Sequence, residues 1–270
     1  EDYAELACRG GLPLALGRSD TARARWFDDY VRRSVDRDAQ ELTQVRQRQA
    51  LADLLGQVAL QTGGLLNITR AAEAVGVERK TAENYLRLLE DLFLAVRLPA
   101  WGTDLRSRVS ARPKVHLVDS GLASRLLRVT PTSVTGFDTT ALSDFGKLLE
   151  TVVVAELRKQ TSWQEAPVTL GHWRTSDEAK VDVVAEFDDG QVLAFDVTPN
   201  ERVTASAFTG LTQLRDALGE RFRAGVVLTT GTRSYTHGDR LHVMPIDRLW
   251  RIGSFPAASR TRVLNPASWK

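Results

Sequence analysis

The chain has 270 residues, of which 43 % are hydrophobic and 26 % are charged. This balance is typical of a globular protein and excludes disordered, collagen-like and coiled-coil chains. The single cysteine, Cys8, excludes a disulfide framework, and the four histidines are too scattered in the sequence to indicate a clustered metal site. No apolar run is long enough to span a bilayer, so we expect a cytoplasmic protein without membrane insertion.

The formal net charge is only +2, so the overall charge does not select a class of partner. Nothing in the sequence specifies an oligomeric state. The chain begins at Glu1, and its only methionine is Met244. Because translation starts at a methionine, we expect the intact protein to contain further residues upstream.

Residues 1–62 are predicted to form an N-terminal helical region. From residue 21 to residue 60, apolar side chains recur at helical spacing, which predicts two amphipathic helices that break near residues 40–46. The first 18 residues are predicted to be irregular because they contain several turn-forming residues, namely Gly10, Gly11, Pro13 and Gly17.

Residues 63–115 have the pattern of a winged helix-turn-helix. Asn67 or Thr69 can cap a first helix that ends at Val75, and Gly76 supplies the tight turn. A second helix is predicted over residues 78–93, with one inward face formed by Ala82, Tyr85, Leu86 and Leu89. Residues 94–98 and 114–118 are predicted to be the strands of the wing.

The charge of this module is concentrated in the predicted wing. Three basic residues oppose four acidic ones along the second helix, whereas residues 96–115 carry a net charge of +4. Phosphate attraction dominates non-specific affinity for DNA, so any binding should be weak, sensitive to salt and largely independent of sequence. The alternative is a packing module without a nucleic-acid ligand. The candidate DNA contacts are Arg79, Lys80, Arg106, Arg108, Arg112 and Lys114.

Residues 116–270 are predicted to form an α/β domain. A short strand at residues 116–118 is followed by a helix at residues 120–127 that Ser120 caps, a loop at residues 129–138 and a long helix at residues 141–160. The remaining predicted elements, in chain order, are strands at 168–174, 180–187 and 191–198, a helix at 204–219, and strands at 223–229 and 241–246.

The hairpin at residues 180–198 determines where its carboxylates lie. A three-residue turn that ends at Gly190 pairs Phe187 with Gln191, and the same register places Asp182 opposite Asp196. Two carboxylates at opposite positions would lie roughly 5 Å apart at Cβ. Such a pair shares a cation, for example Mg²⁺ or Mn²⁺, or shares a proton. The alternative is a pair of solvated strand ends that bind nothing.

Several segments, taken in order, resemble the C-terminal half of bacterial and archaeal AAA-type ATPases that carry domain of unknown function 4143. The resemblance implies a winged helix followed by a PD-(D/E)XK restriction-endonuclease-like domain with a mixed central sheet. It also implies an upstream ATPase domain that would bind the ATP, so no ATP is expected to bind to residues 1–270. The segments are Gly10–Pro13, Asp36–Asp38, Thr62–Asn67, Lys114–Leu122, Gly146–Glu150, Trp173–Thr175 and Val181–Asp182.

Carried over onto this sequence, the catalytic positions of that nuclease-like fold are Glu150, Asp182, Asp196 and Thr198, with Glu156 as the alternative to Glu150. Thr198 stands where the fold has a lysine. A threonine hydroxyl carries no charge and cannot stabilise charge that develops on a phosphate. The site is therefore predicted to be degenerate, with Asp182 and Asp196 as the ligands of a possible metal ion.

These observations predict an accessory C-terminal region of a bacterial AAA-type ATPase that binds nucleic acid or a protein partner. Two alternatives remain open at this stage. The first is a metal-dependent DNA nuclease, which the threonine at position 198 disfavours. The second is a purely protein-interacting or regulatory module.

Overall fold

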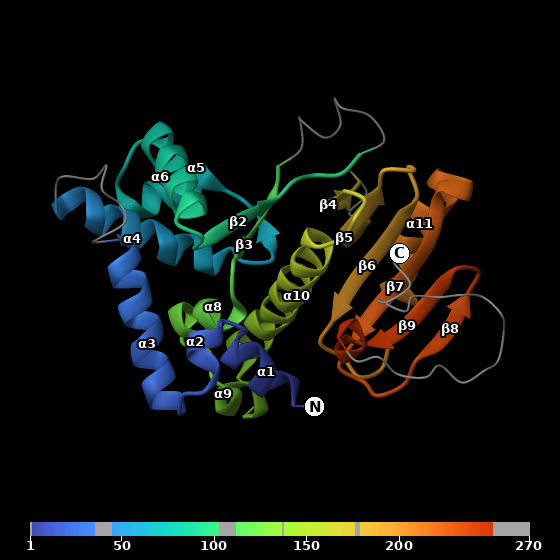
Figure 1. Ribbon diagram of the computed structural model, residues 1–270, viewed down its shortest axis with the longest axis horizontal. Coiled ribbons are helices and arrows are strands. Elements are labelled where there is room, and N and C mark those ends of the chain that lie inside the picture. Colours follow the sequence, from blue (N-terminus) through green and yellow to red (C-terminus); the bar gives the residue numbers. More distant parts are fainter. Residues whose placement is uncertain (1, 36–44, 103–111, 137, 176–178, 251–270) are drawn as a thin grey trace. The chain divides into compact units, whose positions relative to one another are not determined.

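The computed structural model describes residues 2–35, 45–102, 112–136, 138–175 and 179–250 (Figure 1). The chain divides into two compact units, which are described separately. The helical unit contains residues 2–100 and 109–152, and the sheet unit contains residues 1, 101–108 and 153–270. Helices combined with a mixed six-stranded sheet confirm the predicted mixed α and α/β class. The three predicted domain ranges stay predictions, because a compact unit of the structure need not coincide with a domain of the predicted kind.

The helical unit begins with two short helices, α1 (Tyr3–Arg9) and α2 (Pro13–Leu16), so the prediction of an irregular start was wrong. Asp2 caps α1 by accepting hydrogen bonds from the backbone N–H groups of Ala4 and Glu5. Pro13 opens α2, which is the helical position that tolerates proline best. The turn-forming residues therefore separate two helices rather than preventing them.

Two longer helices follow, α3 (Asp20–Arg33) and α4 (Val45–Leu60), and they confirm the predicted helix pair. The predicted break near residues 40–46 falls largely on residues 36–44, which lie outside the described residues. No helix in the part of the chain that the structure describes is long and apolar enough to cross a bilayer.

The central part of the helical unit contains α5 (Ile68–Val75) and α6 (Arg79–Asp91). Asn67 accepts a hydrogen bond from the N–H of Arg70 at 3.0 Å and thereby caps α5, as predicted. Gly76 ends α5 in the left-handed region, with φ of 75°, which a glycine adopts without strain. The predicted inward face of α6 is confirmed, since the four residues Ala82, Tyr85, Leu86 and Leu89 are buried.

A small antiparallel sheet accompanies this helix pair. Its strands are β1 (Gly64–Leu65), β2 (Ala95–Leu98) and β3 (Lys114–Leu117), in the order β1-β3-β2. The predicted strands at residues 94–98 and 114–118 are confirmed. Most of the segment that joins β2 to β3, residues 103–111, lies outside the described residues.

Three further helices follow in the chain: α8 (Ser120–Leu127), α9 (Pro131–Thr135) and α10 (Thr139–Ser162). The N-cap of α8 is Asp119 rather than the predicted Ser120, and its carboxylate accepts a hydrogen bond from the N–H of Leu122 at 3.0 Å. Helix α9 occupies the segment predicted to be a loop, because Thr130 and Ser133 form a capping box at its start.

The sheet unit is built on six strands in the order β4-β5-β6-β7-β9-β8 (Figure 1). β5 is antiparallel to both of its neighbours, β4 and β6. β6, β7 and β9 run parallel, and the edge strand β8 is antiparallel to β9. All the predicted strands of this unit are confirmed. The short, exposed edge strand β8 was not predicted, because its four residues do not alternate between apolar and polar. The strands are β4 (Val168–Arg174), β5 (Lys180–Phe187), β6 (Val192–Thr198), β7 (Phe222–Thr229), β8 (Tyr235–Gly238) and β9 (Leu241–Pro245).

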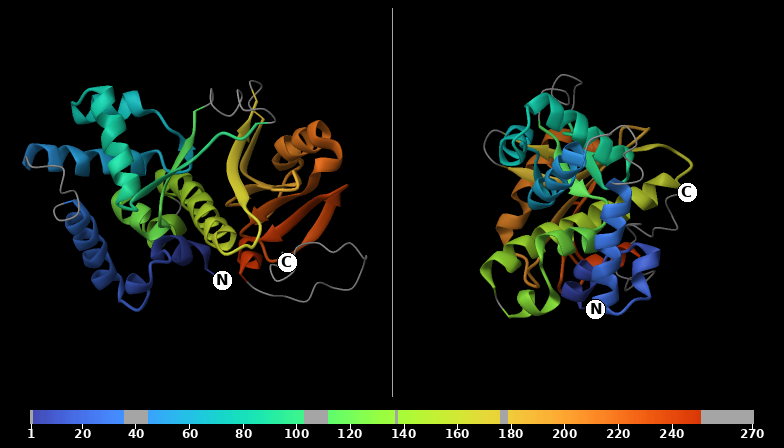
Figure 2. Two further views of the ribbon diagram at one scale, coloured as in Figure 1. Left: turned by 45° about the horizontal axis from the view of Figure 1, so that its top comes forward. Right: turned by 90° about the vertical axis from the view of Figure 1, so that its left-hand side faces the viewer.

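Helix α11 (Thr209–Leu218) packs against the sheet over β5, β6 and β7, as the left-hand view of Figure 2 also shows. Short 3₁₀-helices lie at Ala205–Phe208, Gly219–Arg221 and Ile246–Leu249. The core between α11 and the sheet contains Leu211, Leu214, Val184 and Val227, and Trp101 is buried in the same cluster. The Trp101 indole Nε1–H donates to the Glu186 carboxylate at 3.0 Å.

Gly210 allows α11 to approach the start of β5 closely. A Cβ atom at this position would lie 1.8 Å from the backbone oxygen of Lys180. Any larger residue would therefore force the helix and the strand apart. This contact fixes the backbone at Lys180, which is two residues before the predicted site residue Asp182.

Candidate functional site

An arginine-rich pocket of about 490 Å³ lies in the helical unit, between α6, strand β2 and the segments that precede α5 and β3. We call it the arginine pocket. Four guanidinium groups face a single carboxylate, that of Glu83, among the residues that line it. A concave surface with this charge balance suits a ligand with negative charges, and the planar guanidinium group suits phosphate. The four arginines are Arg79, Arg87, Arg97 and Arg112.

Neighbouring carboxylates position two of the four arginines. Arg79 Nε lies 3.0 Å from a Glu83 carboxylate oxygen. Arg97 donates from Nε to Glu90 at 2.8 Å and makes a second ion-pair contact with the same carboxylate. The hydrogen bond that Arg97 donates to Glu90 raises the pKa of Arg97 further above its ordinary value. Arg87 is exposed and forms no ion pair with any other residue in the described ranges.

The structure places the predicted DNA contacts in different surroundings. Arg79 and Arg112 line the arginine pocket, whereas Lys80 lies exposed on α6 and is not among the residues that line it. Arg106 and Arg108 lie outside the described residues. The predicted set missed Arg87 and Arg97. The helical spacing of Arg79, Glu83 and Arg87 could have indicated one shared face of α6.

Lys114, the last predicted DNA contact, is buried together with Glu150, which the resemblance assigned to the nuclease-like site. Lys114 Nζ donates to Glu150 Oε1 at 2.7 Å, and their side chains are only 9 % and 10 % exposed. His116 Nε2 lies 3.6 Å from the same carboxylate oxygen. The Thr151 hydroxyl lies 3.2 Å from His116 Nδ1 and 3.0 Å from the Thr62 hydroxyl. This polar cluster joins β3 to α10 inside the helical unit.

The other three residues of the predicted nuclease-like site, Asp182, Asp196 and Thr198, belong to the sheet unit. Glu156, the alternative to Glu150, also belongs to the sheet unit, where it pairs with Lys159 at 2.6 Å. Two different units therefore contain the residues that the resemblance assigned to one site.

The β5–β6 hairpin has the predicted register. Gly190 has φ of 78°, and the N–H of Phe187 donates to the oxygen of Gln191 at 2.9 Å. Val183 pairs with Phe195 as predicted. Continuing this register by one position would pair Asp182 with Asp196, and that juxtaposition stays a prediction.

The Asp182 carboxylate already has two donors nearby. Its Oδ1 lies 3.2 Å from Lys180 Nζ, and its Oδ2 accepts a hydrogen bond from the N–H of Val197 at 3.1 Å. The Asp182 side chain is 1 % exposed, whereas the Lys180 side chain is 53 % exposed. The ammonium group therefore reaches a buried carboxylate from the surface.

These residues do not fit a divalent cation as they stand. Mg²⁺ and Mn²⁺ need several oxygen ligands, and the ammonium of Lys180 lies beside one oxygen of the best candidate ligand. No group of three or more His, Cys, Asp or Glu residues within the described ranges is arranged to hold a metal ion.

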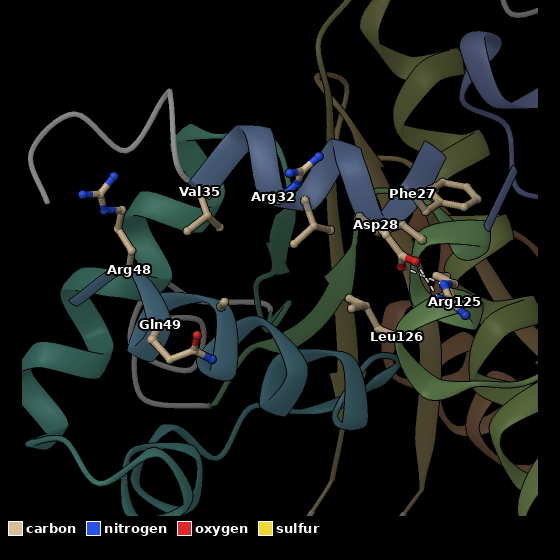
Figure 3. Close-up of a pocket in the computed structure, with 11 residues that line it drawn as sticks. Phe27, Asp28, Arg32, Val35, Arg48, Gln49, Arg125 and Leu126 are labelled. Atoms are coloured by element: carbon tan, nitrogen blue, oxygen red, sulfur yellow. Dashed lines mark hydrogen bonds and ion pairs between the residues drawn. The ribbon is translucent and has the colours of Figure 1, made fainter. Parts of the chain in front are cut away.

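A second pocket of the helical unit, of about 650 Å³, lies between α3, α4 and α8 (Figure 3). In Figure 3, Asp28 of α3 faces Arg125 of α8, and the two form a bidentate ion pair with distances of 2.8 and 2.6 Å. The wall between the charged residues is largely apolar. No sequence motif indicated this pocket, because one of its three helices, α8, is distant in the sequence from α3 and α4. Its apolar lining residues are Phe27, Val31, Val35, Ala52, Leu122 and Leu126.

Comparisons with known proteins identify two regions of similarity. Residues 1–133 match a family model described as Domain of unknown function (DUF8612), and residues 145–249 match one described as Domain of unknown function (DUF4143). The second match confirms part of the resemblance. The matched range is narrower than expected, because the segments that resembled the DUF4143 proteins began at Gly10.

Two curated relatives are uncharacterized proteins, Mb2031c of Mycobacterium bovis and Rv2008c of Mycobacterium tuberculosis. Each is 27 % identical over 255 residues, which is 92 % of this chain and 54 % of the relative. The chain thus spans about half the length of these relatives. No solved structure matches the chain. Residues 145–249, most of which belong to the sheet unit, are similar to the domain of unknown function DUF4143.

Proposed function

We propose that this chain is the nucleic-acid-binding part of a larger cytoplasmic protein, accessory to an AAA-type ATPase domain that lies upstream. The length of the curated relatives, about twice the matched region, supports the presence of further domains. In this proposal ATP binds only to the upstream domain. Calorimetry with Mg-ATP on residues 1–270 should therefore give no saturable binding.

The arginine pocket is the observation that carries the proposal. Helices α5 and α6, joined at Gly76 and followed by the β2 and β3 strands, have the element order of a winged helix-turn-helix. In such a module the second helix and the wing contact DNA, and the pocket lies against both α6 and β2. Phosphate groups of a nucleic-acid backbone are the anions that this surface would bind.

Binding should be weak and should depend little on base sequence. Arg79 and Arg97 are already paired with carboxylates, so phosphate must compete with Glu83 and Glu90. Arg87, which is exposed and forms no ion pair within the described ranges, is the main candidate for a phosphate contact, and Arg112 is a further exposed arginine that lines the pocket. Because phosphate contacts release counterions, the affinity should fall steeply as salt increases.

Titration of a labelled DNA duplex at two salt concentrations, monitored by fluorescence anisotropy, tests the proposal. We expect the double variant Arg87→Gln/Arg112→Gln to bind more weakly and to lower the slope of log affinity against log salt by about two. Arg223→Gln, an exposed arginine of the sheet unit, is the matched control and should bind like the wild type. Equal affinity of the double variant and the wild type at low salt would contradict DNA binding at this pocket.

In the same proposal, the sheet unit is a degenerate PD-(D/E)XK nuclease-like domain. The order of helix α10, strands β4 to β6, helix α11 and strand β7 supports this assignment. Thr198 and the pairing of Lys180 with Asp182 disfavour the alternative of a metal-dependent nuclease. The sheet unit would then add to the stability and to the accessible surface of the protein, and it would not catalyse a reaction.

Binding of a protein partner is the second candidate, and the pocket between α3, α4 and α8 favours it. The pocket combines an apolar wall with the arginines Arg32, Arg48 and Arg125. An amphipathic segment with acidic residues would complement this surface. The DNA titration separates the two candidates, because a chain that binds only proteins gives no salt-dependent signal with the duplex.

A further inference from the structure

The surroundings of Asp182 contain a positive charge that the predicted nuclease-like site does not include. Lys180 precedes Asp182 by two residues on β5, so the alternation of a strand places both side chains on the same face. Lys180 Nζ lies 3.2 Å from Asp182 Oδ1. A carboxylate that is only 1 % exposed requires a compensating charge or hydrogen bonds, because burial without them is costly.

The position of Lys180 is fixed by the packing of the sheet unit. Its backbone lies directly against Gly210 of α11, where a side chain would overlap the Lys180 carbonyl oxygen. Its strand also continues into the hairpin whose register is set by the turn at Gly190. The packing of α11 and the register of the β5–β6 hairpin thus fix the backbone of Lys180, from which the ammonium group extends to Asp182.

We infer that Lys180 is the resident counter-cation of Asp182, so that this carboxylate is neutralised within the chain and does not take up Mg²⁺ or Mn²⁺. A divalent cation at Asp182 would have to displace the ammonium group or approach it closely against charge repulsion. The inference goes beyond the proposed nucleic-acid binding, because it concerns the sheet unit alone and holds whether or not the arginine pocket binds DNA.

Thermal unfolding with and without Mn²⁺ tests this role. Wild-type protein should show the same midpoint in buffer and in millimolar Mn²⁺. Lys180→Met should unfold at a lower temperature, and Mn²⁺ should restore about half of the loss or more, because a ligand that binds only the native state stabilises it. The double variant Lys180→Met/Asp182→Asn should not respond to Mn²⁺, because it lacks the carboxylate.

Two controls separate the charge of Lys180 from general effects of losing a lysine. Lys180→Arg keeps the positive charge and should remain close to the wild type, without a response to Mn²⁺. Lys159→Met removes a lysine that pairs with Glu156 on the surface, and its midpoint should not depend on Mn²⁺ either.

A Mn²⁺-dependent rise of the wild-type midpoint that is lost in Asp182→Asn would overturn the inference. Absence of a Mn²⁺ response in folded Lys180→Met would overturn it as well, because Lys180 would then not stand in for a cation. If Lys180→Met does not fold, Mn²⁺ binding by the folded wild type and by Asp182→Asn tests the inference instead, measured by the water-proton relaxation rate of Mn²⁺ solutions. Wild type and Asp182→Asn should then give the same titration curve, and tighter Mn²⁺ binding by the wild type would refute the inference.

Discussion

Lys114 and Glu150 form one buried ion pair between β3 and α10, with 2.7 Å between Nζ and Oε1. The charge of the predicted wing had suggested phosphate binding for Lys114, and the resemblance had implied a catalytic position for Glu150. A lysine in this position has little exposed surface with which to contact a DNA backbone. The pair therefore serves first to hold the strand and the helix of the helical unit together.

We expect Lys114→Met to lower the free energy of unfolding by about 3–5 kcal/mol, because it leaves the buried Glu150 carboxylate without its cation. The double variant Lys114→Met/Glu150→Leu should recover most of this loss, because it buries no unpaired charge. Urea unfolding monitored by circular dichroism measures both values. A single variant within about 0.5 kcal/mol of the wild type would show that the pair contributes little.

Gly210→Ala should destabilise the sheet unit by several kcal/mol. The new Cβ would overlap the carbonyl oxygen of Lys180, so α11 would have to move away from β5 and expose part of the core. Gly56→Ala is the matched control, because a Cβ at Gly56 meets nothing within 4 Å. Since Gly56 lies inside α4, its replacement should stabilise the protein by about 0.5–1 kcal/mol. The same urea experiment distinguishes the two outcomes.

The stability contribution of Asp119 should depend on pH. Burial raises the pKa of the Asp119 carboxyl above the value of 3.8 of an exposed aspartate. Between 3.8 and the higher native pKa, the native state binds more protons than the unfolded state. The free energy of unfolding therefore falls as the pH rises through this window, by about 1.4 kcal/mol for each pH unit between the unfolded and the native pKa.

Comparison with Asp119→Asn isolates this effect, because all other groups titrate in both proteins. The variant should lose a constant amount of stability, since an amide cannot replace both oxygens that accept from the N–H groups of Gly11 and Leu122. Relative to the wild type, however, its free energy of unfolding should increase as the pH rises from 3.8 through the native pKa of Asp119. A difference that does not change with pH would contradict the raised pKa.

The purified chain should not cleave linear, nicked or branched DNA above background in Mg²⁺ or Mn²⁺. Thr198 supplies no positive charge to a developing phosphate, and loss of one such group typically lowers the rate roughly 10²–10³-fold. Gel electrophoresis of the three substrates measures the activity. Robust cleavage by the wild type that disappears in Asp182→Ala would contradict this prediction.

Local patterns predicted the parts of the fold that depend on neighbouring residues. The turn at Gly190 and the alternation of apolar side chains were enough to predict the β5–β6 register. Gly76 likewise predicted the boundary between α5 and α6. The first helices were missed because Gly10 and Pro13 indicate turns, although each of these residues is also compatible with the edge of a helix.

Contacts between residues distant in the sequence could not be predicted in the same way. Lys114 and Glu150 are 36 positions apart, and no spacing rule connects a strand residue to a helix residue over that distance. The pairing of Lys180 with Asp182 was available from the sequence, because residues two apart on a strand share a face. The resemblance instead placed the expected lysine at position 198, where this chain has a threonine.

Trp101 has a consequence for how this polypeptide reaches its native state. This residue lies between two segments of the helical unit, yet its side chain is buried among β-strand residues that follow it by 80 positions or more, such as Val181 and Val243. On the ribosome, the indole therefore emerges long before its binding partners have been synthesised. The sheet unit cannot complete its core from C-terminal residues alone, so a fragment that starts after Trp101 would leave a cavity that only the missing side chain fills.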